Sequence, residues 1–270
     1  MGKQEKEIYR QELANRQMSI KEAGLPVIVI LEGWGASGKG SALGSIIKYM
    51  DPRFFRVYNM DTMSEDELRK PFLYRHALRM PEKGQFSFFD GSYMDEITKQ
   101  YLQDKISKKE YEAKVDSINQ YERSLRDNGY LVVKFFLHID KKSQKERLEV
   151  LSAKKNTAWR VTEEDLWQNK NFDKCNKLYK QFLKETDTKW APWHEITATD
   201  KDEVERYIAS TLISRIDMAL QNPWVASIPE NPYELVQTEP LAKLPLKDKT
   251  ISEEAYKQEK DRADLLLTKS

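Results

Sequence analysis

Short apolar runs rich in β-branched and aromatic residues alternate along this chain with longer stretches in which apolar residues return every three or four positions. The short runs have the length and composition of buried strands, and the longer stretches have the period of helices. Strands that alternate with helices form parallel sheets, because a parallel pair needs a crossover connection. The pattern therefore predicts an α/β fold with an open parallel sheet, whose strands are expected at residues 27–31, 54–58, 85–90, 130–139 and 193–198.

The helices predicted between these strands begin and end at recognisable signals. Ser64 with Glu67 has the pattern of a capping box, and Asn128-Gly129 is a C-cap signal. The polar excursion at residues 153–190 is too long for an ordinary connection, so we interpret it as a lid or an inserted helical pair. The predicted helical stretches are 3–23, 41–50, 64–80, 93–128, 141–152, 163–185 and 201–220.

These elements suggest three regions. Residues 1–26 form an N-terminal helix, and residues 27–221 form the α/β domain that contains the lid. Residues 222–270 are rich in proline at first and end in a charged stretch with few apolar positions, which predicts a linker followed by a helix at 252–268.

A glycine-rich turn after the first predicted strand carries the strongest functional signal. Residues 27–41 read VIVILEGWGASGKGS, which is the order strand, phosphate loop, helix. Glycines let the backbone approach an anion closely, so main-chain N–H groups and the next helix's N-terminus can point at phosphate oxygens while a lysine adds a full charge. The usual motif ends in Ser or Thr, where this chain has Gly40. The predicted phosphate-binding residues are Gly33, Gly35, Ala36, Ser37, Gly38, Lys39, Gly40 and Ser41.

Two acidic residues stand at the carboxyl ends of predicted strands. Asp61 follows the strand at 54–58, and Asp90 ends the strand at 85–90. Ligands of open parallel sheets bind beyond the carboxyl ends of the strands, so both carboxylates are expected near the phosphate loop. Acids in such positions hold Mg²⁺ in phosphate-transferring proteins. Asp61 and Asp90 are therefore the predicted metal ligands, and Mg²⁺ is the predicted cofactor.

Composition argues against several other classes of protein. Charged residues make up 33% of the chain, but the net charge is only +1, so no nucleic-acid partner is expected. The single cysteine, Cys175, excludes an internal disulfide and a cysteine-based metal cluster. The sequence shows neither a signal-peptide core nor an apolar run long enough for a membrane span, which predicts a cytoplasmic protein without a membrane partner.

Five separated segments resemble a single family. They read EGWGASGKG, FLYRHALRMPEKG, FSFFDGSY, AWRVTEEDLW and TDTKWAPWHEITATD, in this order. Together they resemble the family-2 polyphosphate kinases over about residues 10–218. The resemblance implies a P-loop kinase-like, three-layer α/β/α fold with a mainly parallel sheet and a helical lid at about 153–190.

The resemblance also implies an activity and a set of site residues. The family transfers phosphoryl groups between inorganic polyphosphate and nucleoside phosphates with Mg²⁺, and AMP or ADP is the expected adenine nucleotide here. On matching positions, Lys39, Asp90, Arg75 and Arg79 take catalytic roles, and Arg160 on the lid takes a phosphate-binding role. Cations and N–H groups around the transferred phosphoryl suit a loose, charge-spreading transition state that needs no covalent intermediate.

Two positions depart from the family's usual text. The loop has Gly35 where an Asp is usual, and Gly91 follows Asp90 where an Arg is usual. The Gly24-Leu25-Pro26 text and the tail LPLKDKTISEEAYKQEKDRADLLL resemble the first half and connector of tandem polyphosphate:AMP phosphotransferases.

Three functions stay open at this point. The first is phosphoryl transfer with polyphosphate, and the second is a weakened half-domain that binds polyphosphate or scaffolds an assembly. The third is a nucleoside monophosphate kinase that uses ATP, which shares the loop and a lid. A homo-oligomer is expected, because the charged helical stretches 95–128 and 252–268 could lie against partner subunits.

Overall fold

The computed structural model describes residues 3–60, 63–222, 252–258 and 260. Contacts divide the chain into two units, residues 1–226 and 227–270. In the second unit, residues 253–258 are helical, and the rest of the helix predicted at 252–268 lies outside the described residues apart from residue 260. Asp61, one of the two predicted metal ligands, also lies outside the described residues.

Five parallel strands form the sheet of the first unit. Their order across the sheet is β2-β3-β1-β4-β5, which places β1 in the centre, paired with β3 and β4. The residues of β1 are buried up to Glu32, as expected for a strand covered on both faces. The strands are β1 (Val27–Gly33), β2 (Phe55–Asn59), β3 (Phe86–Asp90), β4 (Leu131–His138) and β5 (Trp193–Thr197).

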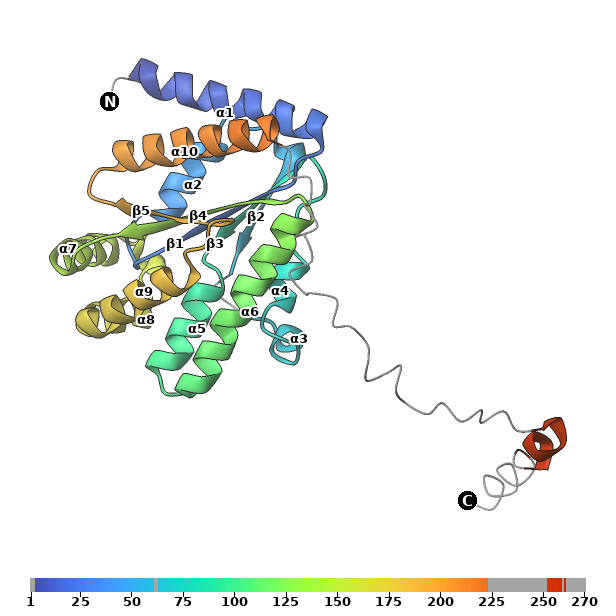
Figure 1. Ribbon diagram of the computed structural model, residues 1–270. Coiled ribbons are helices and arrows are strands. Elements are labelled where there is room, and N and C mark those ends of the chain that lie inside the picture. Colours follow the sequence, from blue (N-terminus) through green and yellow to red (C-terminus); the bar gives the residue numbers. More distant parts are fainter. Residues whose placement is uncertain (1–2, 61–62, 223–251, 259, 261–270) are drawn as a thin grey trace. The chain divides into compact units, whose positions relative to one another are not determined.

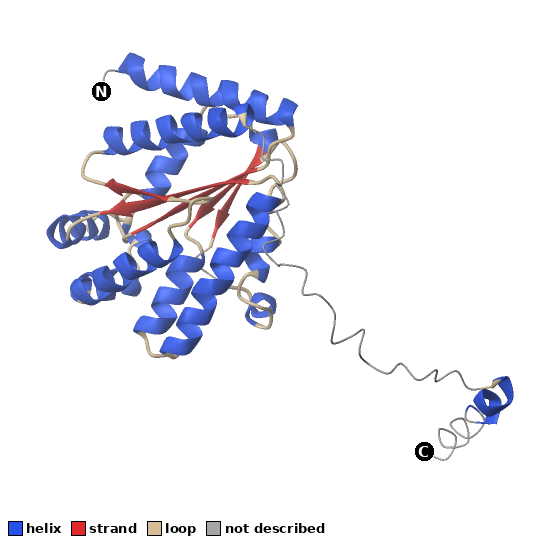
Figure 2. Ribbon diagram, in the orientation of Figure 1, coloured by secondary structure: helices blue, strands red, loops and turns tan. Residues whose placement is uncertain are grey.

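Helices cover both faces of this sheet, as Figures 1 and 2 show. One face packs against α1 (Lys3–Ala23), α2 (Lys39–Ile47) and α10 (Lys201–Gln221). The other packs against α5 (Tyr93–Leu102), α6 (Lys108–Asp127) and α9 (Phe172–Thr186). Alternate residues of the strands enter the two cores, so that Val27, Val29 and Leu31 face one layer and Ile28 and Ile30 the other. The predicted three-layer α/β/α fold is confirmed.

The prediction of a single helix at residues 64–80 is wrong. The structure has two short helices, α3 (Glu65–Leu68) and α4 (Tyr74–Ala77), with Pro71 between them. Proline disfavours helical geometry in the residue before it and removes a backbone donor, so the first helix cannot continue. The capping box of Ser64 and Glu67 is present as predicted.

The helical stretch predicted at 93–128 is also two helices, α5 and α6, which meet at a turn containing Asp104 with φ 55°. A second capping box, from Ser107 and Glu110, starts α6. Both helices bury an apolar stripe in the protein's own core, including Ile97 and Ile118. The polar character of this stretch therefore belongs to its outer faces.

The predicted lid region contains three elements, after α7 (Lys141–Ser152): η2 (Ala158–Arg160), α8 (Glu163–Lys170) and α9. Thr162 and Asp165 form a capping box at the start of α8. Cys175 is buried on α9 with a free thiol. Among the described residues, no helix is both long and apolar enough to span a membrane.

Candidate active site

The glycine-rich turn lies at the carboxyl end of β1, the central strand. It leads directly into α2, whose first residue is Lys39 and whose N-cap is Gly38, with φ 102°. Ala36 also has a left-handed backbone, with φ 58°. The Ser37 hydroxyl is buried and makes no hydrogen bond within the described part of the chain. The local geometry is thus a strand, a tight loop and a helix N-terminus, as a phosphate loop requires.

Lys39 folds back onto the loop. Its Nζ donates to the carbonyl oxygen of Gly33 at 2.8 Å and to that of Trp34 at 3.3 Å. The ammonium is therefore held at the loop by main-chain oxygens. A phosphate oxygen, which is charged, is a stronger acceptor than these carbonyls.

Asp90 lies beside the start of α2. The register of the sheet pairs it with Leu31 of β1, and its Oδ2 lies 3.6 Å from the position that a Cβ on Gly40 would occupy. The structure therefore brings Lys39 and Asp90 to one edge of the sheet, although the sequence separates them widely.

Glu32, the last buried residue of β1, supports this edge from inside. Its Oε1 accepts hydrogen bonds from the Ser92 hydroxyl at 2.7 Å and from the Asp95 N–H at 3.3 Å. Burial, with the nearby Asp95 carboxylate, raises the pKa of Glu32 to about 7. The start of α5 is thereby attached to the strand that carries the phosphate loop.

The Asp90 carboxylate suits a Mg²⁺ ion that arrives with phosphate. No group of three or more His, Cys, Asp or Glu side chains among the described residues is arranged to hold a metal by itself. Mg²⁺ in kinase sites is commonly bound by one or two carboxylates together with substrate phosphate oxygens and water. Asp90, next to the helix that follows the loop, fits this kind of site.

Trp34, inside the loop, anchors it to the lid region. Its side chain is fully buried and stacks on Phe172 with ring centroids 4.0 Å apart. The indole Nε1 donates to His138 Nδ1 at 3.2 Å, and the Tyr179 ring meets the indole edge-on. Because Phe172 and Tyr179 belong to α9, the loop and this helix are packed together as one body.

Two polar side chains of α7 hold the loop from another direction. Arg147 donates to the carbonyl oxygens of Ala36 and Ser37, at 3.4 and 3.2 Å. Gln144 donates to the Gly35 carbonyl at 3.3 Å and to Gln168 Oε1 at 2.7 Å. These contacts satisfy main-chain oxygens of the loop. Some of its N–H groups are paired as well, since the Gly35 N–H donates to Gln168 Oε1 at 2.9 Å and the Ser37 N–H to the Trp34 carbonyl at 3.1 Å.

The two arginines predicted to bind phosphate share an acidic partner. Arg79 Nη2 lies 2.6 Å from Glu67 Oε1, and Arg75 Nε lies 4.0 Å from Glu67 Oε2. Arg75 is buried, and Arg79 also donates to the Arg75 carbonyl at 2.7 Å. The hydrogen bond from the Ser64 N–H and the two arginines lower the pKa of Glu67, although burial acts in the opposite direction. The structure thus groups the arginines around α3.

Comparison with known proteins assigns the chain to a family. The profile of the family described as Polyphosphate kinase 2 (PPK2) matches residues 1–223. The chain belongs to the polyphosphate kinase 2 family.

Curated relatives of this polyphosphate kinase 2 member include nucleotide phosphotransferases. A Polyphosphate:AMP phosphotransferase from Pseudomonas aeruginosa is 30% identical over 204 residues, which cover 75% of this chain and 40% of the relative. An AMP/ADP-polyphosphate phosphotransferase from Meiothermus ruber is 26% identical over 198 residues, covering 73% of this chain and 74% of the relative. The chain spans 40% to 43% of the length of the three Polyphosphate:AMP phosphotransferases that it matches.

A solved structure of the same family supports the fold. The Polyphosphate Kinase 2 from Arthrobacter aurescens TC1 aligns with a TM-score of 0.75 at 23% sequence identity. The alignment covers 89% of this chain and 85% of that chain. The chain therefore has the overall fold of a known polyphosphate kinase 2.

At both positions where the sequence departs from the usual polyphosphate kinase 2 motifs, Gly35 and Gly91, the structure shows why a larger residue fits poorly. A Cβ on Gly35 would lie 2.0 Å from Asp165 Oδ1, so the lid already fills the space of a side chain there. Gly91 has φ 80°, a left-handed backbone that an arginine would adopt only with strain. The usual side chains cannot simply be restored at these two positions.

Arg160, the predicted lid arginine, lies in an exposed turn. Its guanidinium carbon is 5.3 Å from the centre of the Trp159 ring, and that indole is 75% exposed. Glu164, at the start of α8, pairs with Lys99 of α5. The lid therefore touches the site side of the domain through α8, while η2 stays open to solvent.

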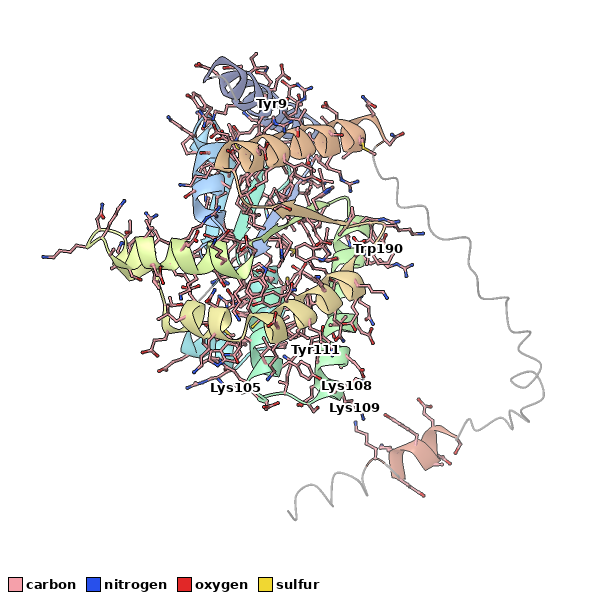
Figure 3. All side chains as sticks on the ribbon, turned by 90° about the vertical axis from the view of Figure 1, so that its left-hand side faces the viewer. Tyr9, Lys105, Lys108, Lys109, Tyr111 and Trp190 are labelled. Carbon is pink, nitrogen blue, oxygen red and sulfur yellow. The ribbon has the colours of Figure 1, made fainter. Side chains whose placement is uncertain are left out.

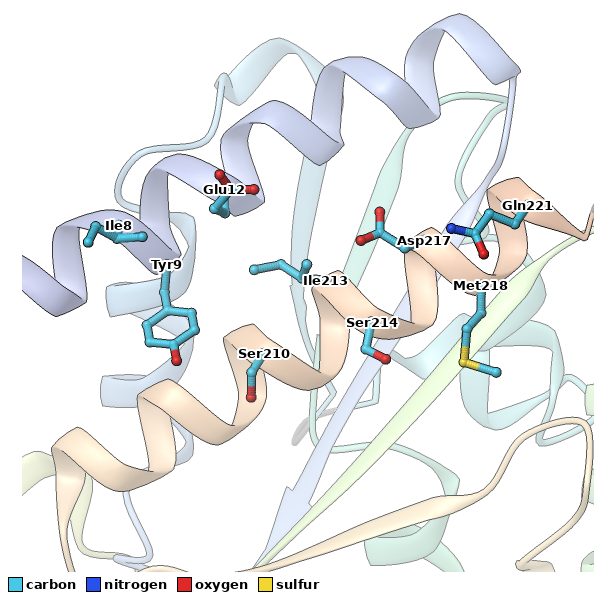
Figure 4. Close-up of a pocket in the computed structure, with 9 residues that line it drawn as sticks. All are labelled: Ile8, Tyr9, Glu12, Ser210, Ile213, Ser214, Asp217, Met218 and Gln221. Atoms are coloured by element: carbon cyan, nitrogen blue, oxygen red, sulfur yellow. The ribbon is translucent and has the colours of Figure 1, made fainter.

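Other polar and apolar surface features lie apart from the loop. Lys105, Lys108 and Lys109 are exposed around the turn between α5 and α6 (Figure 3). This turn is at the far end of α5 from Ser92, roughly 15 Å along a ten-residue helix. A groove of about 450 Å³ lies between α1 and α10 (Figure 4), and its lining, which includes Ile8 and Met218, contains no residue of the phosphate loop.

Sequence reasoning missed the residues that hold the loop in place. Gln168 and Gly35 are 133 positions apart, and Arg147 and Ala36 are 111 apart. A glutamine or arginine on a polar helix carries no local pattern that points to a distant loop. Trp34 was within a recognised motif, but its burial depends on aromatic residues that only the fold brings to it.

Proposed function

We propose that this member of the polyphosphate kinase 2 family transfers a phosphoryl group between inorganic polyphosphate and AMP or ADP, with Mg²⁺. The observation that carries the proposal is the placement of Lys39 and Asp90 at adjoining strand ends, around a loop that begins a helix. The names of the matched relatives support polyphosphate and adenine nucleotides as the substrate classes.

In the direction of nucleotide synthesis, an oxygen of the nucleotide's terminal phosphate attacks the terminal phosphorus of the polymer. The P–O bond to the rest of the polymer breaks, and the shortened polyphosphate leaves with the bonding electrons. Main-chain N–H groups at the N-terminus of α2 bind the phosphate oxygens, and no covalent intermediate is needed. Lys39 exchanges its carbonyl partners on Gly33 and Trp34 for these oxygens as charge spreads onto them.

The remaining charged groups take supporting roles in this proposal. Asp90 would hold the Mg²⁺, which neutralises charge on the phosphate oxygens when it is bound. Arg75 and Arg79 would bind phosphates farther along the polymer, in exchange for part of their pairing with Glu67. Arg160, exposed at the end of η2, would add a phosphate contact when a long polyanion is present.

A direct assay tests the proposal. The full chain is incubated with long-chain polyphosphate, Mg²⁺ and either AMP or ADP, and new ADP or ATP is measured. Lys39→Ala should abolish the product, while Lys48→Ala, an exposed lysine just beyond the other end of α2, should leave it unchanged. Equal activity of wild type and Lys39→Ala refutes the role of the loop. Transfer from ATP with polyphosphate inert would instead indicate a nucleoside monophosphate kinase.

A second candidate function has a specific observation in its favour. Gly35 and Gly91 lack the family's usual side chains, and the structure leaves no strain-free room for them. A domain of this kind could bind polyphosphate, or scaffold a longer protein, without catalysis. It predicts saturable polyphosphate binding that Lys39→Ala weakens, with no nucleotide product in the same assay.

The cytoplasmic location and the homo-oligomer expected from the sequence also stand as proposals. Size-exclusion chromatography of the full chain with light scattering tests the second, and a monomer at micromolar concentration would contradict it.

A further inference from the structure

Gly35 is a glycine for a reason that lies outside the loop. Unlike Gly33 and Gly38, it has no left-handed φ, so its backbone would accept any residue. A Cβ there would lie 2.0 Å from Asp165 Oδ1 and 2.9 Å from Asp165 Cγ. The lid carboxylate, and not the loop's own conformation, therefore excludes a side chain at position 35.

Asp165 is held in this position by its own helix. Its Oδ2 accepts from the Thr162 N–H at 2.9 Å and from the Thr162 hydroxyl at 2.8 Å. This capping box fixes the carboxyl group and turns Oδ1 to the loop.

A second residue on the same face of α8 fixes the helix against the loop. Gln168, three positions after Asp165, accepts the Gly35 N–H at 2.9 Å. Its amide is buried, accepts from Gln144 at 2.7 Å and donates to the Tyr179 hydroxyl at 2.7 Å. The carboxylate of Asp165 is therefore placed at the loop by a satisfied, buried hydrogen-bond network.

We propose that Asp165 is a positioning residue for the divalent cation that accompanies phosphate at this loop. A carboxylate against a loop that binds phosphate would repel the phosphate unless a cation lies between them. Carboxylate and phosphate oxygens are the ligands that Mg²⁺ prefers. In this chain the lid, and not residue 35, supplies an acidic side chain at this point of the loop. The inference rests on the proposed function for the identity of the ligand.

Direct metal binding tests the inference without turnover. Free Mn²⁺ is followed by electron paramagnetic resonance while it is titrated into the full chain with tripolyphosphate. Asp165→Asn keeps the size of the side chain and an oxygen for the cap but removes the charge. We expect it to weaken Mn²⁺ binding on the order of tenfold or more, as loss of a metal's supporting groups does. Glu163→Gln is the matched control, because it removes one carboxylate charge from an exposed side chain in the same first turn of α8, and it should bind Mn²⁺ like the wild type.

Moving the carboxylate from position 165 of α8 to position 35 of the loop provides an independent test of the inference. Gly35→Asp alone should weaken binding, because the new side chain collides with Asp165. Gly35→Asp combined with Asp165→Ala supplies the charge from the loop side and should recover much of the Mn²⁺ affinity that Asp165→Ala alone loses. Recovery would show that the carboxylate matters at this place, whichever element carries it.

Three results would overturn the inference. The first is wild-type Mn²⁺ affinity in Asp165→Asn, and the second is an equal weakening of metal-free tripolyphosphate binding by that variant, which would mean that the substitution damages the loop and not the place of the cation. The third is a wild-type chain that binds no Mn²⁺ with tripolyphosphate. If the wild type binds both but forms no nucleotide product, the proposed transfer reaction fails while the role of Asp165 stands.

Discussion

Lys134 is a fully buried cation on β4, and its removal provides a sharp test of how the core is held together. Its Nζ donates to both carboxylate oxygens of Glu122, at 2.9 and 2.8 Å, and to the Thr186 carbonyl at 2.8 Å. The Tyr93 hydroxyl donates to the same carboxylate. Burial raises the pKa of Glu122 and lowers the pKa of Lys134, so each charge depends on the other.

Lys134→Met leaves the Glu122 carboxylate buried with Tyr93 as its remaining partner in this network. Breaking one side of a buried pair costs about 3–5 kcal/mol of unfolding free energy, because the other charge is left uncompensated. For a domain of this size, about 2–4 °C is lost per kcal/mol, so the melting temperature should fall by roughly 6–20 °C. The double variant Lys134→Met with Glu122→Leu removes both charges and should lie within about 2 kcal/mol of the wild type, or above it.

Urea denaturation of the three proteins at pH 5 and pH 8 measures the effect. Without Lys134, the folded-state pKa of Glu122 rises further above its unfolded value. A raised carboxyl pKa means that stability is present at low pH and is lost as the pH rises through the folded pKa. The deficit of Lys134→Met should therefore be larger at pH 8 than at pH 5. A deficit below about 1 kcal/mol at pH 8, or a double variant less stable than the single one, would refute the reasoning.

Three further predictions concern the loop and its support. Trp34→Ala should lower the unfolding free energy by about 3–5 kcal/mol in urea titrations, because it empties a fully buried aromatic stack, and a loss below about 1 kcal/mol would exclude an anchoring role. Glu32, whose pKa burial raises to about 7, takes up a proton on folding, so its stabilisation is lost as the pH rises through 7. Wild type should therefore lose about 3 kcal/mol more than Glu32→Gln between pH 4.5 and pH 8, and equal slopes would contradict this. Gly91→Ala, at φ 80°, should destabilise by about 1–2 kcal/mol in thermal melts, whereas Gly44→Ala within α2 should be neutral or stabilising, and equal effects would contradict the backbone argument.

Local signals were sufficient for most of the secondary structure. The predicted strands and the helices at 3–23, 141–152 and 201–220 agree closely with the observed bounds, because their apolar period and capping residues are short-range properties. Two predicted helices, 64–80 and 93–128, were each drawn as continuous although the structure divides them, the first at Pro71 and the second at the turn after Leu102. Such errors arise because helical periodicity on either side of a short interruption looks continuous.

The phosphate loop could be located from sequence because all of its parts are contiguous. The strand, the glycines, Lys39 and the following helix occupy one short stretch, so their spacing alone carries the chemistry. The proximity of Asp90 also followed from a general rule, since the carboxyl ends of parallel strands meet at one edge of the sheet.

What the sequence by itself determined is therefore the order of the elements, the parallel sheet and the loop at the end of its first strand. Only the tertiary structure decided what surrounds that loop, which is Trp34 packed under α9 and Asp165 in the space that Gly35 leaves open, and only it paired Arg79 with Glu67. The physical reason is the range of the interactions. Period, capping and glycine backbone freedom act within a few residues, whereas packing and charge pairing depend on which distant segments the fold brings into contact.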